Sequence, residues 1–164
     1  MLMDLNSYTQ GPRFQLDELP DLVARLSADL LPEPATVATT GVHLGKELTL
    51  PTISMETILA ELFTNARKFH PRQHPRVTVS AVPAENDMIM LTVADDGITL
   101  APNQREHAWL PYFQGDKYVT GEVSGMGLGL SMVASLVLDA GGRCSLINRD
   151  DRTGVAVHLT LPLA

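Results

Sequence analysis

The 164-residue sequence contains a single cysteine, Cys144. One cysteine excludes an internal disulfide and a metal site built from several thiolates, so a reduced, cytoplasmic setting is expected. Cationic residues are also few, because 12 lysines and arginines stand against 19 aspartates and glutamates, for a net charge of −7. A chain of this charge repels a phosphate backbone at long range. We therefore expect no nucleic acid partner, and any phosphate must be bound locally, by backbone amides, a metal ion or a few cations.

Long apolar runs are absent as well. No segment approaches the roughly 20 apolar residues that cross a bilayer, and Asp4 interrupts the start of the chain before the apolar core of a signal peptide develops. Hydrophobic residues make up 45% and charged residues 19% of the chain, which is typical of globular proteins. The length suits one domain with a proper core. We expect a soluble cytoplasmic domain, whose parent protein could still be membrane-anchored.

The apolar pattern divides the chain into a short leader and one domain. Residues 1–14 are polar and broken by Gly11-Pro12, so they are predicted to be a stub or linker before a domain of residues 15–164. Helical spacing of apolar residues predicts helices, and short alternating or apolar runs predict strands. The predicted helices are 16–31, 52–70, 104–110 and 127–140. The predicted strands are 76–82, 88–94, 143–148 and 155–161, with a weaker strand pair around Val42 and 48–50. This mixed order indicates an α+β sandwich, with one sheet covered by helices on one face.

One face of the predicted 52–70 helix carries an acid, an amide and a cation. Glu61, Asn65 and Lys68 are spaced i, i+4 and i+7, beside an apolar stripe that runs from Met55 to Phe69. Such a row could orient a Mg²⁺ ion, its waters and a triphosphate. An ordinary exposed helix face is the alternative. Asparagine has a poor helix propensity in the middle of a helix, which favours a functional role for Asn65.

A second polar signal follows the predicted 88–94 strand, which ends in Asp95-Asp96-Gly97. A carboxylate at a strand end can accept a hydrogen bond from an exocyclic amine such as that of adenine. Gly97 would let the backbone come close to a flat ring. Taken alone, the motif is more typical of a plain Asp-Gly turn.

Three glycines at alternate positions, Gly125, Gly127 and Gly129, open the predicted buried helix. They would let backbone N–H groups approach a phosphate, where the start of a helix adds a favourable field. Two better-known glycine motifs are excluded. A Walker loop needs Lys-Ser or Lys-Thr after the glycines, and the dinucleotide fingerprint needs Gly-x-Gly-x-x-Gly in the first strand-to-helix turn.

Together and in this order, the motifs resemble those of the ATPase family that includes histidine kinases, gyrase, Hsp90 and MutL. Residues 61–68, Glu-Leu-Phe-Thr-Asn-Ala-Arg-Lys, resemble its asparagine box, and Asp95-Asp96-Gly97 resembles its adenine-binding glycine box. Residues 125–130, Gly-Met-Gly-Leu-Gly-Leu, resemble the second glycine box. Between them, residues 109–116, Trp-Leu-Pro-Tyr-Phe-Gln-Gly-Asp, are similar to the phenylalanine box of histidine kinases. The likeness covers roughly residues 50–162 and is greatest to the catalytic domain of sensor histidine kinases.

This resemblance implies a fold, two ligands and a set of roles. The fold is the two-layer α/β sandwich of the Bergerat type, a mixed sheet covered by helices on one face, with a flexible ATP lid. ATP and Mg²⁺ are the implied ligands. Asn65 would coordinate the metal and Asp95 would bind the adenine amine, while Glu61 would assist the accepting nucleophile, as a base or by orienting it. The remaining implied ATP-binding residues are Lys68, Gly97, Tyr112, Lys117, Gly125, Gly127, Leu128 and Gly129.

The sequence departs from the family pattern at several positions. Thr99 stands where the adenine box has its second glycine, and Gln114 stands where a phosphate-contacting arginine is often found. Trp109 and Tyr112 replace phenylalanines and keep a packing role. Loss of the arginine puts the handling of the γ-phosphate in question, with Lys117 as a substitute. A degenerate nucleotide-binding or interaction module is therefore one alternative.

A histidine kinase also needs an acceptor histidine on a dimerising helical hairpin, and none of the five histidines lies in such a segment. Residues 1–8 resemble the stub of that hairpin's second helix. We therefore expect a catalytic domain that passes the γ-phosphoryl group of ATP to a histidine on its own dimerisation domain, absent from this chain, with a response regulator downstream. An anti-sigma-factor-type serine kinase of the same fold is a second alternative. A gyrase- or MutL-type ATPase is a third, although it would need a transducer domain.

Overall fold

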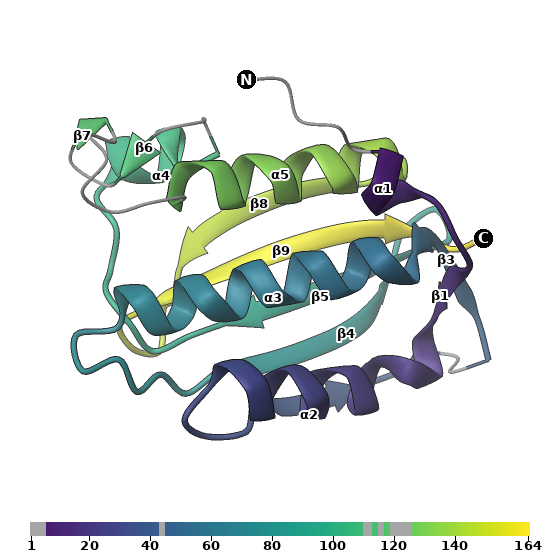
Figure 1. Ribbon diagram of the computed structural model, residues 1–164, viewed down its shortest axis with the longest axis horizontal. Coiled ribbons are helices and arrows are strands. Elements are labelled where there is room, and N and C mark those ends of the chain that lie inside the picture. The colour runs from purple at the N-terminus through teal and green to yellow at the C-terminus, as the bar shows by residue number, and fades with distance from the viewer. Residues whose placement is uncertain (1–5, 43–44, 110–112, 115–116, 119–125) are drawn as a thin grey trace.

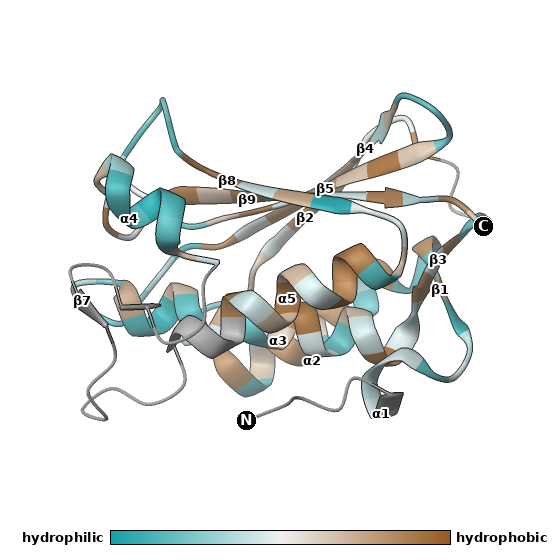
Figure 2. Ribbon diagram, turned by 90° about the horizontal axis from the view of Figure 1, so that it is seen from above, coloured by the Kyte–Doolittle hydropathy of each residue, from teal (hydrophilic) through white to brown (hydrophobic). Residues whose placement is uncertain are grey.

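Five strands form a mixed sheet, and helices cover one of its faces (Figures 1 and 2). This computed structural model describes residues 6–42, 45–109, 113–114, 117–118 and 126–164. In spatial order the strands are β2 (Thr36–Thr39), β4 (Thr78–Ala84), β5 (Met88–Ala94), β9 (Val155–Pro162) and β8 (Arg143–Asn148). The β2 and β4 strands are parallel, and the other neighbours are antiparallel. The predicted α+β sandwich, with a mixed sheet covered on one face, is confirmed.

The helical layer consists mainly of α2 (Leu19–Leu30), α3 (Thr52–Phe69) and α5 (Met126–Asp139). A 3-10 turn, η1 (Leu16–Glu18), precedes α2, and the short helices are α1 (Asn6–Thr9) and α4 (Pro102–His107). Within the described ranges, no helix has the length and hydrophobicity needed to cross a membrane.

The α3 helix, which carries the asparagine box, has clear local causes. Its apolar stripe is buried at Met55, Ile58, Leu59, Leu62, Phe63 and Ala66. The helix ends because His70 precedes Pro71, which disfavours helical geometry in the residue before it, and His70 is indeed extended, at φ −75° and ψ 134°. The helix therefore stops where its last residue, Phe69, reaches the edge of the sheet layer.

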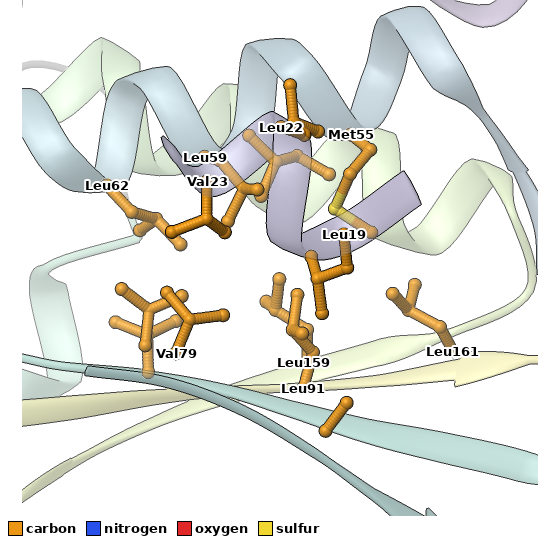
Figure 3. Packing of buried hydrophobic residues seen from close by; sticks show 14 of the residues in the cluster. Leu19, Leu22, Val23, Met55, Leu59, Leu62, Val79, Leu91, Leu159 and Leu161 are labelled. Atoms are coloured by element: carbon orange, nitrogen blue, oxygen red, sulfur yellow. The ribbon is translucent and has the colours of Figure 1, made fainter. Parts of the chain in front are cut away.

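Side chains of α2 and α3 fill the space above the sheet (Figure 3). Leu19, Leu22 and Val23 descend from α2, and Met55, Leu59 and Leu62 descend from α3. They face Val79, Leu91, Leu159 and Leu161, which alternate along their strands on the covered face. Since each fully buried side chain of this size contributes about 1.5–3 kcal/mol, this layer is the main source of stability and holds α3 rigidly over the sheet.

The predicted pair of strands around Val42 and 48–50 is wrong. Val42 lies outside any strand, and β2 pairs in parallel with β4. The β3 strand (Glu47–Pro51) instead pairs antiparallel with β1 (Arg13–Gln15) in a two-stranded sheet, which meets the chain just after β9 at a bridge between Leu48 and Leu163. Strand partners depend on side-chain packing rather than on nearness in sequence, so short runs such as these carry little information about pairing.

The leader is in contact with the domain before residue 15. Phe14 is fully buried in β1, the carbonyl oxygen of Pro12 accepts the N–H of Thr52 at 2.9 Å, and the Ser54 hydroxyl donates to the carbonyl oxygen of Tyr8. The boundary predicted between residues 14 and 15 therefore falls within β1. That residues 1–8 derive from the helix of a preceding hairpin stays a prediction.

Candidate functional site

A cavity opens between the carboxyl-terminal half of α3, the end of β5 and the helices α4 and α5. Its volume is about 120 Å³, or about 870 Å³ when the open solvent at its mouth is counted. Its wall is largely apolar and consists of Leu62, Asn65, Ala66, Phe69, Val93, Asp95, Ile98, Leu100, Gln104, Ala108, Leu130, Leu146, Val155 and Val157. The few polar groups, chiefly Asn65 and Asp95, are therefore the ones that can orient a ligand.

Asn65 contributes an unsatisfied amide to this wall. Its Nδ2 atom is buried and has no hydrogen-bond partner among the described residues. A buried donor left without a partner costs about 1–3 kcal/mol, so the side chain is held ready for a ligand at the expense of stability. The oxygen and nitrogen of an amide can exchange places by a flip of the side chain, so either end can meet that ligand.

The two other predicted residues of this helix are placed differently. Glu61, one turn before Asn65, is half-buried, and loss of solvation raises the pKa of its carboxyl group. Lys68 is exposed and lines a separate hollow on the α2 side of α3, together with Asp29, Leu30, Thr64, Arg67 and Gln73. The structure thus brings Asn65 to the cavity wall, while Glu61 and Lys68 lie outside its lining.

Asp95 lies at the other polar point of the cavity, directly after β5. Its Oδ1 accepts the N–H of Gly97 at 2.9 Å and that of Val155 at 3.5 Å. Burial raises the pKa of this carboxyl group, and the two backbone hydrogen bonds offset part of that rise. Because both bonds use Oδ1, the Oδ2 atom is the oxygen that can serve a ligand.

Gly97 is required by this local geometry. A Cβ atom at this position would lie 3.1 Å from Asp95 Oδ1, closer than ordinary van der Waals contact. The glycine therefore lets its own N–H reach the carboxylate, and it keeps the turn compact beside the last residues of α3.

The neighbouring Asp96 faces away from the cavity. Its Oδ1 accepts the N–H of Arg76 at 2.8 Å and lies 3.3 Å from His70 Nε2. The His70 Nδ1 atom accepts the N–H of Arg72 at 3.1 Å, which assigns the ring proton to Nε2 and makes it a donor to Asp96. Asp96 thus ties the turn to the loop after α3, and Asp95 alone of the two is on the cavity wall.

The turn between β8 and β9 supports Asp95 from behind. Arg149 Nη1 donates to the carbonyl oxygen of Asp95 at 3.1 Å, and its Nε and Nη2 atoms bind Asp151 at 3.0 and 2.9 Å. Gly154, at φ +119°, packs against the same carbonyl group. The sequence analysis did not identify Arg149 as part of the site, because nothing in its local sequence indicates a contact 54 residues away.

Phe69 and Ile98 form an exposed apolar pair on the wall, with 39% and 40% of their surfaces accessible. The sequence analysis placed Phe69 in the apolar stripe of α3, and the other members of that stripe are buried. Phe69, at the last stripe position, lines the cavity instead. The position of Phe69 at the very end of the helix, just before His70-Pro71, was the available signal.

For several predicted site residues the structure describes only the backbone, and others lie outside the described residues. Tyr112 and Gly125 lie outside the described residues. Lys117 is placed in β7 (Lys117–Tyr118), which pairs with β6 (Phe113–Gln114), and Gly127, Leu128 and Gly129 are placed in the first turn of α5, in each case by the backbone alone. The predicted helix after the glycines is confirmed, and Leu130, the next residue, reaches the cavity wall.

The donor set suits a metal ion that is held mainly by its ligand's phosphates. No group of three or more His, Cys, Asp or Glu side chains able to hold a metal occurs in the described part of the chain. Mg²⁺ typically takes one or two protein oxygens and completes its octahedron with water and substrate phosphates. The Asn65 side chain lies on the cavity wall and carries an amide oxygen of the kind that Mg²⁺ accepts as a ligand, while its unpartnered Nδ2 can donate to a phosphate oxygen.

The fold is a two-layer α+β sandwich, and its cavity has the largely apolar wall and few polar groups that are typical of a small-molecule site. Residues 52–164 match the sequence model of the histidine kinase-, DNA gyrase B- and HSP90-like ATPases, and the chain belongs to that family. The family predicted from the motifs is thereby confirmed.

Curated relatives and solved structures indicate which kind of protein within this ATPase family the chain is similar to. Sensor histidine kinase AruS of Pseudomonas aeruginosa is 36% identical over 97 residues, which are 58% of this chain and 10% of AruS. Sensor histidine kinase ZraS of Salmonella typhi is 35% identical over 106 residues, 65% of this chain and 21% of ZraS. The chain thus spans about a tenth to a fifth of the length of these curated relatives.

Two solved structures share the fold. Full-length ShkA in complex with AMPPNP superposes with a TM-score of 0.74 at 21% identity, over 95% of this chain and 32% of that one. The mycobacterial sensor histidine kinase MprB gives a TM-score of 0.67 at 22% identity, over 90% and 93% of the two chains. The chain is the catalytic ATPase domain of the sensor histidine kinase type, as predicted.

Proposed function

We propose that this domain binds ATP with Mg²⁺ in the cavity between Asn65 and Asp95, and that it supplies the γ-phosphoryl group to a histidine on a separate dimerisation domain. The observation that carries the proposal is the buried, unpartnered amide of Asn65 on a cavity wall that also presents the Asp95 carboxylate. An amide kept unsatisfied in an otherwise apolar wall is a cost that a bound ligand would remove.

At the base end, Asp95 would select adenine. Its Oδ2 atom would accept a hydrogen bond from the exocyclic amine, since Oδ1 is engaged by Gly97 and Val155. Guanine presents a carbonyl oxygen at the equivalent position, which a carboxylate repels. Phe69 and Ile98 offer the flat, apolar contact that a purine ring requires.

At the phosphate end, Asn65 would hold the metal ion, which when bound neutralises phosphate charge. The glycines Gly125, Gly127 and Gly129 would let the backbone at the start of α5 approach the phosphates. Tyr112, Lys117 and Leu128 complete the proposed ATP contacts, whereas Lys68 lines the hollow on the α2 side of α3 and would contact phosphate only from outside the cavity lining. Phosphoryl transfer relies mainly on positioning and charge neutralisation, which is the kind of catalysis that such a set of groups can provide.

Glu61 would assist the accepting histidine. A general base works best when its pKa lies near the working pH, and desolvation moves the pKa of Glu61 upward in that direction. Glu61 is one helical turn from Asn65 and outside the cavity lining, so it would lie beside the proposed metal site. Both proposed roles, proton acceptor and orienting group, are compatible with this placement.

The relatives extend the proposal to a signalling pathway. Both AruS and ZraS are named sensor histidine kinases, so we infer a response regulator downstream and a parent protein that can be anchored in a membrane. The alternatives of a degenerate module or an anti-sigma-factor-type kinase are not favoured, because the matched relatives are sensor kinases and both Asn65 and Asp95 are in place.

The test is isothermal titration with a non-hydrolysable ATP analogue, with and without Mg²⁺. The wild-type domain should bind, and Mg²⁺ should strengthen the binding. Asn65→Leu should lose the Mg²⁺-dependent gain, an effect of at least about tenfold, or ~1.4 kcal/mol. Thr64→Ala, an exposed neighbour on the same helix, should bind as the wild type does. Absence of wild-type binding at millimolar analogue would rule the proposal out.

A further inference from the structure

The side chain of Asn148 makes two reciprocal hydrogen bonds with the backbone of Leu100. Its Oδ1 accepts the N–H of Leu100 at 2.9 Å, and its Nδ2 donates to the carbonyl oxygen of Leu100 at 2.8 Å. Both bonds are partly buried and join residues 48 positions apart. Asn148 is the last residue of β8, so its amide extends the hydrogen bonding of the sheet edge to a residue that belongs to no strand.

Leu100 occupies a sensitive place in the chain. It lies on the cavity wall, between the Asp95–Gly97 turn and α4, whose Gln104 and Ala108 are also on the wall. The chain continues from here into α4 and on to α5. We refer to residues 100 and 101 as the Leu100–Ala101 segment. Pro102 has no N–H, and the N–H of Ala101 is bound locally by Gln104 Oε1 at 2.7 Å. Among the described hydrogen bonds, the two made by Asn148 connect the Leu100–Ala101 segment to the sheet.

We propose that Asn148 is a positioning residue for nucleotide binding, which holds the Leu100–Ala101 segment in place without touching the nucleotide. This inference rests on the proposed ATP-binding function. Because Asn148 ties this segment to β8, the Leu100 side chain stays on the cavity wall and α4 leaves the sheet in one direction. The part of the cavity wall that Leu100 forms is then in place before the nucleotide binds, and preorganisation of a site lowers the cost of association.

The chemistry of the contact is specific to asparagine. Leu100 presents one donor and one acceptor, and a planar amide can satisfy both at once. An aspartate at this position would keep the bond from the Leu100 N–H but would bring a carboxylate oxygen against the Leu100 carbonyl oxygen. Protonation of that carboxylate would restore a donor. The variant Asn148→Asp should therefore regain function as the pH is lowered, which a purely steric role of the side chain would not produce.

The experiment compares wild type, Asn148→Ala, Asn148→Asp and Asn103→Ala, the last an exposed asparagine on α4 that serves as the matched control. The readouts are amide hydrogen exchange at Leu100, titration with a non-hydrolysable ATP analogue plus Mg²⁺, and thermal unfolding. Asn148→Ala should raise the exchange rate of the Leu100 amide at least about tenfold and weaken binding roughly five- to tenfold. Asn148→Asp should show the same loss at pH 7.5, and its affinity relative to wild type should rise as the pH is lowered toward the ordinary aspartate pKa of about 3.9.

The possible outcomes distinguish the positioning role of Asn148 from the proposed ATP-binding function. Wild-type affinity in Asn148→Ala would overturn the inference, and so would faster exchange spread over the whole sheet, because the effect would then be a general loss of stability. Failure of the wild type to bind the analogue would overturn the proposed function instead. The hydrogen-exchange rate of the Leu100 amide would in that case still show whether Asn148 holds the Leu100–Ala101 segment to β8.

Discussion

Gly154 packs directly against the peptide group of Asp95, the residue proposed to bind adenine. A Cβ atom at position 154 would lie 2.0 Å from the Asp95 carbonyl oxygen and 2.8 Å from its carbonyl carbon. The same carbonyl oxygen accepts a hydrogen bond from Arg149, and the Asp95 N–H donates to the carbonyl oxygen of Val155 at 3.0 Å. The position of the Asp95 carboxylate is therefore set by the turn between β8 and β9, about 60 residues further along the chain.

Gly154→Ala should reduce both stability and nucleotide affinity. Gly154 has φ +119°, which costs a residue with a side chain about 1–3 kcal/mol, and the clash with Asp95 adds to this cost by forcing the turn away. Urea denaturation should show the loss of stability, and titration with an ATP analogue should show at least tenfold weaker binding at a temperature where the variant is folded.

Gly11→Ala is the matched control for this substitution. Gly11 has nearly the same φ, +117°, yet a Cβ atom there would have nothing within 4 Å. It should show only the cost of the backbone conformation and leave nucleotide affinity unchanged. Equal destabilisation by the two variants would show that the contact with Asp95 is unimportant.

Asp95→Asn should abolish nucleotide binding and leave the fold intact. The amide oxygen can still accept the N–H groups of Gly97 and Val155, whereas the amide nitrogen would meet the adenine amine as donor against donor. Titration should show at least a tenfold loss of affinity, with an unchanged circular dichroism spectrum. Retained affinity would remove Asp95 from the adenine site.

The same variant should change how stability depends on pH. Burial raises the pKa of Asp95 in the folded state above its ordinary value of about 3.9. Between these two values the folded state binds more protons than the unfolded state, so the free energy of unfolding falls as the pH rises through that window. Asp95→Asn cannot ionise and lacks this fall. It should be at least as stable as the wild type at pH 7, and its relative advantage should disappear near pH 3.5.

Asp96→Ala should have the opposite profile. Asp96 accepts bonds from the Arg76 N–H and His70 Nε2 and does not line the cavity. Losing these two partners should lower the free energy of unfolding by about 1–2 kcal/mol, with a smaller effect on nucleotide affinity than Asp95→Asn. Urea denaturation and titration of the two variants side by side would check this, and a larger affinity loss in Asp96→Ala would contradict the assignment of the two carboxylates.

Two phenylalanines should separate stability from binding. Phe14 is fully buried in β1, whereas Phe69 is 39% exposed on the cavity wall. Phe14→Ala should cost about 3–5 kcal/mol of stability, which would also show that the domain includes residues before the predicted boundary at 15. Phe69→Ala should change stability by less than about 1 kcal/mol and weaken binding of an ATP analogue about tenfold. If Phe69→Ala binds normally, the ring does not contact adenine.

Local sequence was sufficient for the elements with strong, uninterrupted patterns. The apolar stripe and the proline at position 71 predicted the α3 helix to within a residue of its observed end, and the 88–94 strand was predicted with its observed bounds. Asn65 on α3 could be selected because asparagine is unfavourable in the middle of a helix, whereas Asp95 after β5 could be selected only from the order of the motifs. Their order along the chain was enough to predict the family.

Tertiary structure alone decided how those elements meet. The sequence could not tell that β3 pairs with β1, or that Phe69 is exposed while Phe14 is buried. Nor could it show that Asn148 holds Leu100 or that Gly154 supports Asp95. Helical and strand periodicities are carried by neighbours a few residues apart, and the backbone expresses them wherever the segment lies. Contacts between residues about 50 positions apart leave no such periodic trace, because they exist only once the sheet has brought the two segments together.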